Sequence, residues 1–247
     1  SRVPVSSTHF HDTHSTADDS AVYPLAGAII AAPSSAIIAL ATFFPDAAWV
    51  LATIAVGTTI AVTGALHEDG LADVADGFFA TQDKDRILTI MRDPHLGTFG
   101  TLALVISVIL KIAAVATLIN TAGAIQTAGA LIGIEAASRA AMVWHWYSLD
   151  NVRPDGKAAA AGQPDEKAWQ TALALGLALF ALFAIALPGL WFQGATAIAA
   201  CAMIATAFAQ LCRTRIGGHT GDSVGATQQL TAVGMLAVLA ISTNLPT

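Results

Sequence analysis

Long apolar runs separated by short polar connections dominate the chain. Seven windows of about 20 predominantly apolar residues, the length that a helix needs to cross a bilayer, follow one another at 23–44, 47–66, 98–119, 122–147, 168–187, 190–211 and 224–242. Turn signals separate them, namely Pro45 with Asp46, Asn120, Pro188 with Gly189, and the glycines between 217 and 221. The pattern predicts an all-α polytopic membrane bundle of about seven transmembrane helices. Residues 1–22 are expected to form a polar segment, and residues 23–247 a single transmembrane domain.

Composition strengthens this interpretation and excludes two classes of protein. Of 247 residues, 55% are hydrophobic and 11% charged, and the mean hydropathy is +0.65, whereas soluble domains carry about 25% charged residues. A water-soluble globule is therefore excluded. The net charge of -6 gives no basic surface for nucleic acid. Cys201 and Cys212 lie too far apart along one predicted helix for a disulfide. No signal-peptide pattern is present, so insertion into the membrane is expected to rely on the internal helices.

The basic residues predict an orientation. Nine of the eleven Lys and Arg residues lie in the connections on one side of the predicted bundle or before its first helix, and none lies in the loops near residues 45, 120 and 188. By the positive-inside rule the basic connections face the cytoplasm. Nearly all of the acidic residues are on the same side, so the chemistry is expected there, in loops that face the cytoplasm. The polar start of the chain, with His9, His11 and His14, is interpreted as a mobile tail.

The stretch H-E-D-G-L-A-D-V-A-D-G at 67–77 is the most informative motif. On a helix Asp69, Asp73 and Asp76 fall within an arc of roughly 60°. Three carboxylates so close repel one another and raise one another's pKa unless a cation neutralises them. Oxygen ligands favour a hard ion such as Mg²⁺ over zinc. A solvated acidic face is the structural alternative, but such faces normally mix charges, and no basic residue other than His67 stands between 67 and 82.

Three further polar segments carry candidate residues. In R-D-P-H-L-G-T-F-G, Arg92 is a candidate for holding a diphosphate, and Gly97 and Gly100 permit close helix contact. In the turn G-G-H-T-G-D at 217–222, the glycines allow backbone amides to approach an anion, Asp222 is available to a cation, and Arg213 and Arg215 to phosphate. Glu135 and Arg139, one turn apart in a predicted span, are expected to pair or to face a polar cavity. Lys111 receives no role.

Together these residues resemble the integral-membrane cobalamin 5'-phosphate synthases, also called adenosylcobinamide-GDP ribazoletransferases. The resemblance is carried in the family's order by 67–77, by I-M-R-D-P-H-L-G-T-F-G at 90–100, E-A-A-S-R at 135–139, R-P-D-G at 153–156 and G-G-H-T-G-D-S-V-G-A at 217–226. The first motif is highly specific and the others persuade jointly. The chain departs from the family in its polar, histidine-containing start, since an apolar segment usually precedes the S-R-V-P sequence.

The resemblance implies a late step of cobalamin assembly. The ribose hydroxyl of α-ribazole, or of its 5'-phosphate, attacks the cobinamide-side phosphorus of adenosylcobinamide-GDP and releases GMP. On this basis Asp69, Asp73 and Asp76 are assigned to Mg²⁺ and to catalysis, with Asp222 completing the metal shell, and His67 or Glu68 is the candidate base. The predicted substrate-binding residues are Arg92, Arg139, Arg153, Arg215, Gly217 and Gly218. A homo-oligomer, or a complex with other enzymes of the pathway, stays open.

Two other functions use carboxylates on membrane helices. A phosphotransferase resembling the CDP-alcohol family also uses aspartates on membrane helices, but its D-G-x-x-A-R opening is not met, since Asp73 and Val74 occupy the Ala and Arg positions. A cation-coupled transporter also places carboxylates in a helical bundle, yet such sites lie near the bilayer midplane on broken helices. The acidic residues here follow the second predicted span and cluster at its inner edge.

Overall fold

The computed structural model describes residues 17–153, 161–185 and 191–243, and every regular element in these ranges is a helix. Seven helices are long: α1 (Tyr23–Ala39), α2 (Ala48–Thr63), α5 (Thr98–Thr121), α6 (Ala124–Ser148), α8 (Glu166–Ile185), α9 (Trp191–Arg215) and α10 (Gly221–Ser242). Two are shorter, α3 (Leu66–Ala80) and α4 (Lys84–Ile90), and 3-10 turns occupy η2 (Asp18–Val22), η3 (Leu40–Thr42) and η4 (Pro45–Ala47). Each of the seven predicted windows contains one long helix, and the all-α bundle is confirmed.

Five helical segments are long and apolar enough to cross a membrane: Asp19–Thr42, Pro45–Thr63, Thr98–Thr121, Trp191–Arg215 and Gly221–Ser242. Many of their outward side chains are apolar, with Ile29, Val50 and Ile109 each more than half exposed. Exposed side chains of this kind suit contact with lipid. The chain is therefore a multi-pass membrane protein, while spanning by α6 and α8 as well stays a prediction.

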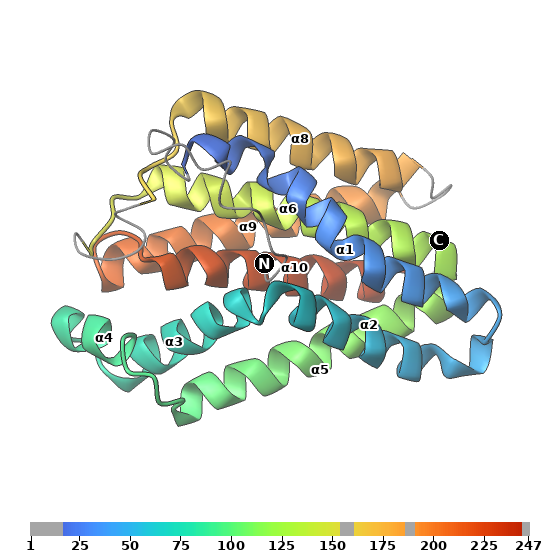
Figure 1. Cartoon of the computed structure of the whole chain (residues 1–247), viewed down its shortest axis with the longest axis horizontal. Coiled ribbons are helices and arrows are strands. Elements are labelled where there is room, and N and C mark those ends of the chain that lie inside the picture. Colours follow the sequence, from blue (N-terminus) through green and yellow to red (C-terminus); the bar gives the residue numbers. More distant parts are fainter. Residues whose placement is uncertain (1–16, 154–160, 186–190, 244–247) are drawn as a thin grey trace, which may run out of the picture.

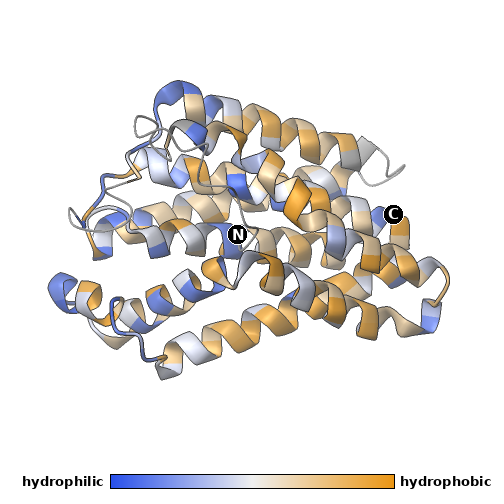
Figure 2. Cartoon of the chain, in the orientation of Figure 1, coloured by the Kyte–Doolittle hydropathy of each residue, from blue (hydrophilic) through white to orange (hydrophobic). Residues whose placement is uncertain are grey.

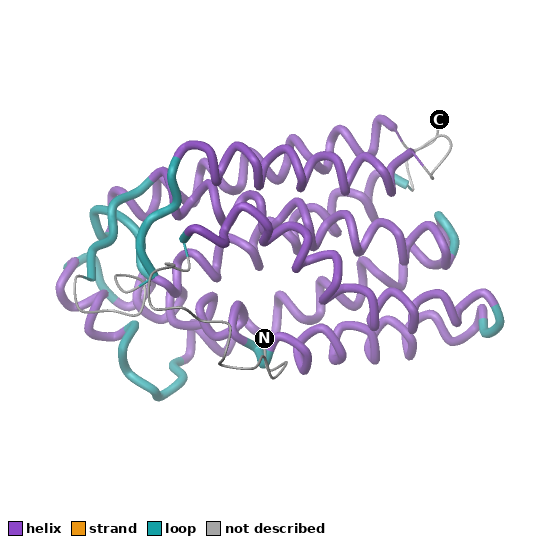
Figure 3. The backbone as a smooth tube through the Cα atoms, turned by 45° about the horizontal axis from the view of Figure 1, so that its top comes forward, coloured by secondary structure: helices purple, strands orange, loops and turns teal. Residues whose placement is uncertain are grey.

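The connections between helices sort to the two ends of the bundle (Figures 1 and 3). α4 and the links α3–α4, α4–α5 and α9–α10 gather at one end, which we call the polar end, together with the described parts of the α6–α8 link. The links α1–α2 and α5–α6 lie at the other. Hydrophilic residues concentrate at the polar end (Figure 2). This is the division of loops that the basic residues predicted.

A break separates α2 from α3. Gly64 and Ala65 both have left-handed backbone conformations, with φ of 66° and 58°. Glycine adopts this conformation without strain, and Ala65 is the one non-glycine residue among those described with positive φ. The break ends α2 just before residue 66, where the predicted second window ended. Because α2 and α3 both pack against α5, α3 begins inside the bundle and runs out to the polar end (Figure 1).

Close helix packing and reduced cysteines were also predicted. α3 approaches α10 so closely that a Cβ on Gly70 would lie 2.6 Å from the carbonyl oxygen of Asp222. Cys201 and Cys212 are free and buried, as expected.

The three histidines of the predicted tail lie outside the described residues. The described part begins at Ala17, which is buried and whose amide donates to the carbonyl oxygen of Ala161 at 2.9 Å.

Candidate active site

Asp69, Asp73 and Asp76 lie on α3, as the motif predicted. Asp69 is exposed, and Asp73 and Asp76 are half-buried. The close approach of α3 to α10 at Gly70 brings the first turn of α10, which carries Asp222, to this stripe. Thr220 begins α10 with a capping box, because its hydroxyl accepts from the amide of Ser223 at 3.2 Å. We call the four carboxylates Asp69, Asp73, Asp76 and Asp222 the acidic cluster.

Ionisation of Asp73 is disfavoured by burial and by the other carboxylates of the acidic cluster. Burial and the negative charges of Asp222 and Asp69 raise the pKa of Asp73 from 3.8 to about 7, and Asp76 adds to the effect. Arg153 opposes this rise in pKa. The predicted mutual repulsion is thus present in the structure, and it leaves Asp73 only partly ionised near neutral pH. A cation beside Asp73 would favour its charged form.

Arg153 connects the acidic cluster to α4. Its Nη1 donates to Oδ2 of Asp222 at 2.8 Å, and its Nη2 donates to the carbonyl oxygen of Leu88 at 3.2 Å. Its Nε is buried and has no partner in the described part of the chain. Of the predicted arginines, Arg153 is the one that contacts a carboxylate of the cluster. The following residues of the R-P-D-G motif, 154–156, lie outside the described residues.

The link after α6 and the turn before α10 are joined by backbone hydrogen bonds. The amide of His219 donates to the carbonyl oxygen of Asp150 at 2.8 Å, and the amide of Val152 donates to the carbonyl oxygen of His219 at 3.0 Å. A Cβ on Gly218 would lie 2.1 Å from the Asp150 carbonyl oxygen, so only glycine permits this contact. Gly218 is buried, whereas Gly217 is exposed and has φ of 81°. These glycines shape the turn that presents Asp222, and no ligand contact is needed to explain them.

Asp76 anchors the start of α5. Its Oδ2 accepts from the amide of Gly97 and its Oδ1 from that of Gly100, both at 2.8 Å. A carboxylate at a helix N-terminus satisfies free backbone N–H groups and complements the helix dipole. A Cβ on Gly97 or Gly100 would lie 2.4 or 2.3 Å from an oxygen of Asp76, so the close contact that the glycines predicted is confirmed. Each oxygen keeps a second lone pair, so Asp76 also remains available as a ligand.

Glu68 and His67, the two candidate bases, lie at the start of α3 beside buried basic side chains. Glu68 is buried, and its Oε1 accepts from Lys111 Nζ at 3.2 Å and from Gln229 Nε2 at 3.1 Å. Burial, with Arg139 and Lys111 nearby, lowers the pKa of His67, and its buried Nδ1 has no partner among the described residues. His67 is therefore a neutral imidazole with a free ring nitrogen. Glu68 is committed to an ion pair.

The pair of Glu68 and Lys111 continues into a chain of buried polar side chains that sequence analysis missed. Gln229 accepts from Lys111 and donates to Gln228 Oε1 at 2.9 Å, and Gln228 donates to Glu135 Oε2 at 3.1 Å. Glu135 pairs with Arg139, as predicted. We call these six residues the buried polar chain; it joins α3, α5, α10 and α6. The adjacent glutamines within an apolar span were the available signal.

The remaining arginines occupy three different settings. Arg139 uses Nη1 for Glu135 and leaves Nη2 buried and without a partner in the described ranges. Arg215 donates to the carbonyl oxygens of Phe78 and Thr81, the latter at 2.6 Å, and so closes the carboxyl end of α3. Arg92 is exposed between α4 and α5, and among the described residues no side chain pairs with it. Substrate binding by these arginines stays a prediction.

The acidic cluster does not by itself complete a metal site. Within the described residues, no group of three or more His, Cys, Asp or Glu side chains is arranged so that it could hold a metal ion. The cluster does gather oxygen donors, and Asp73 carries a pKa that a cation would lower. This donor set fits Mg²⁺, which usually takes one or two carboxylates and completes its shell with waters and substrate phosphates.

Fold and site together define a multi-pass helical membrane protein with crowded carboxylates at one end. The chain belongs to the cobalamin-5-phosphate synthase family, whose model matches residues 1–240. Curated relatives named adenosylcobinamide-GDP ribazoletransferase include one from Allorhizobium ampelinum, 43% identical over 98% of this chain and 93% of the relative. Those from a Sinorhizobium species and Brucella ovis are 40% and 42% identical, over 98% and 97% of this chain and 93% and 91% of theirs. No solved structure gives a significant match.

Proposed function

We propose that the protein transfers the adenosylcobinamide phosphate group from adenosylcobinamide-GDP to the ribose hydroxyl of α-ribazole or α-ribazole 5'-phosphate. The hydroxyl oxygen forms a bond to the cobinamide-side phosphorus, the bond from that phosphorus to the bridging oxygen breaks, and GMP leaves. The hydroxyl proton passes to a base. The relatives' names support this activity, and the observation that carries it is the crowding of Asp73 against Asp69 and Asp222.

Mg²⁺ is the proposed cofactor, held by one or two of the carboxylates of Asp69, Asp73 and Asp222, with Asp76 at the edge of the site and with waters and substrate phosphates completing the shell. When bound, this ion screens the diphosphate oxygens and stabilises the charge on the leaving GMP. Arg153 keeps Asp222 in place and has an unused Nε that is a donor for a phosphate oxygen. Arg92 lies at the same end of the bundle and is free to reach an incoming diphosphate.

The base is proposed to be His67 rather than Glu68. Glu68 forms a buried ion pair with Lys111, so protonation of this carboxylate would leave the Lys111 cation buried without its partner. His67 stays neutral and has a free nitrogen. A neutral imidazole can take a proton as the hydroxyl attacks. Comparison of His67→Gln with Glu68→Gln tests the choice, since the proposal expects the histidine variant to lose more turnover per folded molecule.

Family membership weighs against the two alternatives. Transporters also have broken helices, but their sites lie near the bilayer midplane. Here the acidic cluster lies along α3 toward the polar end, and Asp76 of α3 accepts hydrogen bonds from the amides at the start of α5. A CDP-alcohol phosphotransferase would need the D-G-x-x-A-R pattern that the sequence lacks.

The decisive experiment is GMP release by purified protein supplied with adenosylcobinamide-GDP and α-ribazole. We expect EDTA to abolish turnover, Mg²⁺ or Mn²⁺ to restore it, and a zinc-selective chelator to leave it unchanged. The proposal fails if no GMP is released in the presence of Mg²⁺. Full turnover after rigorous metal removal would refute the role of the carboxylates while leaving the reaction in place.

We also propose that the polar end faces the cytoplasm of a bacterial inner membrane. The support is the basic residues in the connections at this end and their absence from the connections near residues 45 and 120. Ala80→Cys and Asp46→Cys, each in a background without Cys201 and Cys212, place one exposed thiol at each end. An impermeant reagent outside the cell should label position 46 alone. Labelling of position 80 would reverse the orientation.

A further inference from the structure

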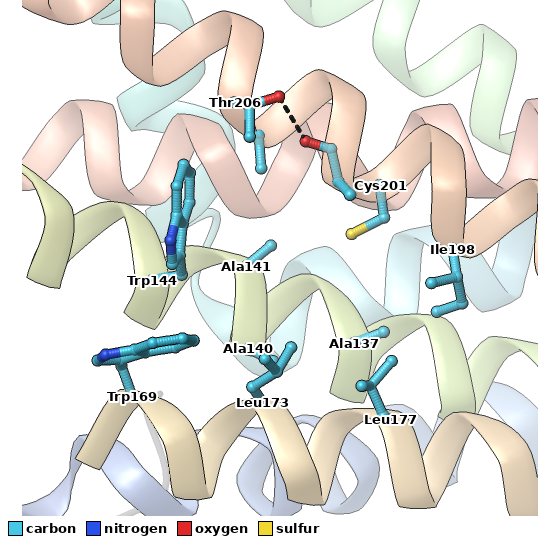
Figure 4. Close-up of a pocket in the computed structure, with 12 residues that line it drawn as sticks. Ala137, Ala140, Ala141, Trp144, Trp169, Leu173, Leu177, Ile198, Cys201 and Thr206 are labelled. Atoms are coloured by element: carbon cyan, nitrogen blue, oxygen red, sulfur yellow. Dashed lines mark hydrogen bonds between the residues drawn. The ribbon is translucent and has the colours of Figure 1, made fainter. Parts of the chain in front are cut away.

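A lateral groove lies between α6, α8 and α9, on helices that do not carry the acidic cluster. Its volume is about 290 Å³, and Figure 4 shows Trp144 and Trp169 at one end of it and Leu177 and Ile198 toward the other. Leu173 and Leu177 on its wall are 38% and 41% exposed, so the groove opens to the surroundings of the bundle. Because α9 is a candidate membrane span, those surroundings are the bilayer.

The lining of the groove consists mainly of apolar side chains. Thr206 is the one hydroxyl-bearing residue among those that line it, and its Oγ1 already donates to the carbonyl oxygen of Ala202 at 2.8 Å (Figure 4) and to that of Met203 at 3.0 Å. The indole N–H of Trp169 is buried without a partner in the described part of the chain, so one donor remains at the tryptophan end of the groove. The aliphatic part of the lining offers no hydrogen bond to a nucleotide or another polar ligand. Burial of a flexible hydrocarbon chain, in contrast, needs only such a surface.

A positive charge stands beyond the tryptophan end. Gln210 and Arg213 follow Thr206 by four and seven residues, which places them on the same face of α9, with Arg213 about 10 Å nearer the polar end. Arg213 is exposed, and its Nη1 donates to Gln210 Oε1 at 3.2 Å. The groove thus passes from an arginine, through two tryptophans, to aliphatic side chains. Phospholipids have the complementary order: a phosphate, an interfacial region and acyl chains, with Trp favoured at the interface.

We propose that this groove binds one phospholipid molecule, with an acyl chain along α6 between α8 and α9 and its phosphate beside Arg213. The site is separate from the proposed transfer reaction and does not depend on it. Its bound lipid fills the space between α8 and α9, which both pack on α6 but make little contact with each other.

The test is lipid retention by the full chain. Protein is reconstituted in vesicles of one part phosphatidylglycerol to four parts phosphatidylcholine, extracted in mild detergent, and analysed by native mass spectrometry. We expect about one retained phospholipid per chain. Ala202→Phe places a ring in the groove and should abolish retention, while Ala207→Phe, on the same helix but outside the groove, should not. Arg213→Gln should weaken retention about fivefold, the equivalent of about 1 kcal/mol for one arginine near a headgroup. Arg86→Gln on α4 is the matched loss of charge and should change nothing.

Four outcomes would overturn the proposal. If the wild type retains no phospholipid, or if Ala202→Phe retains as much as Ala207→Phe, the groove is not a lipid site. If the wild type is a dimer that Ala202→Phe alone converts to a monomer with lipid retention unchanged, the groove instead holds a second copy of the chain. Equal loss of lipid from Arg213→Gln and Arg86→Gln would remove the assigned headgroup position and with it the proposed binding mode.

Discussion

The acidic cluster and the buried polar chain both include residues of α3, but they differ in net charge and in exposure to solvent. On one face of α3, Asp69 and Asp73 crowd against Asp222 with Arg153 as the basic partner in contact. On another, Glu68 is only one residue away from Asp69, yet it is enclosed with Lys111 and Gln229. The first group carries surplus negative charge and reaches solvent. The second is neutral in sum, buried, and linked donor to acceptor as far as Glu135 and Arg139.

This contrast indicates what each region does. Charged side chains inside an apolar bundle are tolerated where they are paired. The buried polar chain therefore has a structural role, because it connects α3, α5, α6 and α10. Burial and surplus negative charge, which together raise the pKa of Asp73, have no such structural reason, and perturbed groups of this kind gather at functional sites. Substitutions in the cluster should therefore change activity, and substitutions in the chain should change stability.

The largest expected effect is that of Asp73→Asn on turnover. The amide keeps the shape of the side chain and removes one negative charge, so α3 should fold while the metal loses a ligand. We expect GMP release at saturating Mg²⁺ to fall roughly a thousandfold or more, which corresponds to about 4 kcal/mol. Asp46→Asn, an exposed acid at the opposite end, is the control and should turn over normally.

Asp73→Asn should leave the folded state as stable as the wild type, or more stable, since one source of repulsion is removed. If well-folded Asp73→Asn turns over within about threefold of the wild type, a difference of only about 0.65 kcal/mol, the carboxylate belongs to a solvated face. The proposed metal site would then have to be built from Asp69, Asp76 and Asp222.

The buried polar chain is tested by Lys111→Met, which leaves the Glu68 carboxylate buried without its cation. Side-chain exposures of 7% and 6% for these two residues give the charge no route to water. Stranding a buried charge should lower the free energy of unfolding by about 3 kcal/mol. In the double variant Lys111→Met with Glu68→Gln no charge is stranded, and much of the loss should be recovered. The free energy of unfolding of the wild type, the single variant and the double variant is measured in detergent. Equal values for all three would contradict a structural role for the buried polar chain.

Gly97→Ala tests the contact between Asp76 and α5. Its new Cβ would lie 2.4 Å from an Asp76 oxygen, so either the carboxylate or the first turn of α5 must move. We expect a loss of about 1–3 kcal/mol in stability, together with reduced turnover. Gly57→Ala is the matched control, because a Cβ there meets nothing within 4 Å, and it should be neutral or slightly stabilising. Indistinguishable variants would contradict the proposed anchor.

The smallest effect concerns pH. Because the pKa of Asp73 is raised from 3.8 to about 7, ionising it opposes folding, and the penalty grows as pH rises from about 4 to 7. Asp73→Asn removes this penalty, so in EDTA its stability advantage over the wild type should be larger at pH 8 than at pH 5, by on the order of 1 kcal/mol after solvent screening. Mg²⁺ at pH 8 should shrink the advantage. Thermal melts that show no pH dependence would contradict the crowding of Asp73.

Hydropathy and helical spacing predicted more of the fold than of the contacts. Every long apolar window became a helix, and the pairing of Glu135 with Arg139 follows from their spacing of four residues. The break at Gly64 and Ala65 was not foreseen, because a glycine followed by an alanine within an apolar run resembles ordinary small-residue packing. Periodicity describes one helix at a time, and it cannot show where two helices approach.

The same limit explains the site. The shared stripe of Asp69, Asp73 and Asp76 could be predicted since all three belong to one helix. The hydrogen bonds of Asp76 to residues 21 and 24 positions away, and the placement of Arg153 against Asp222 across 69 positions, depend on tertiary packing. Lys111 had no predicted role for the same reason, because its partner Glu68 is 43 residues distant.

Binding of Mn²⁺ followed by electron paramagnetic resonance tests the central claim directly, since it requires neither substrate turnover nor a choice of base. The account predicts that the purified wild-type protein binds Mn²⁺ in competition with Mg²⁺, and that Asp73→Asn weakens this binding at least tenfold. The double variant Lys111→Met with Glu68→Gln should bind as the wild type does, per folded molecule. Equal affinity of Asp73→Asn and wild type for Mn²⁺ would contradict the assignment of the acidic cluster to a metal.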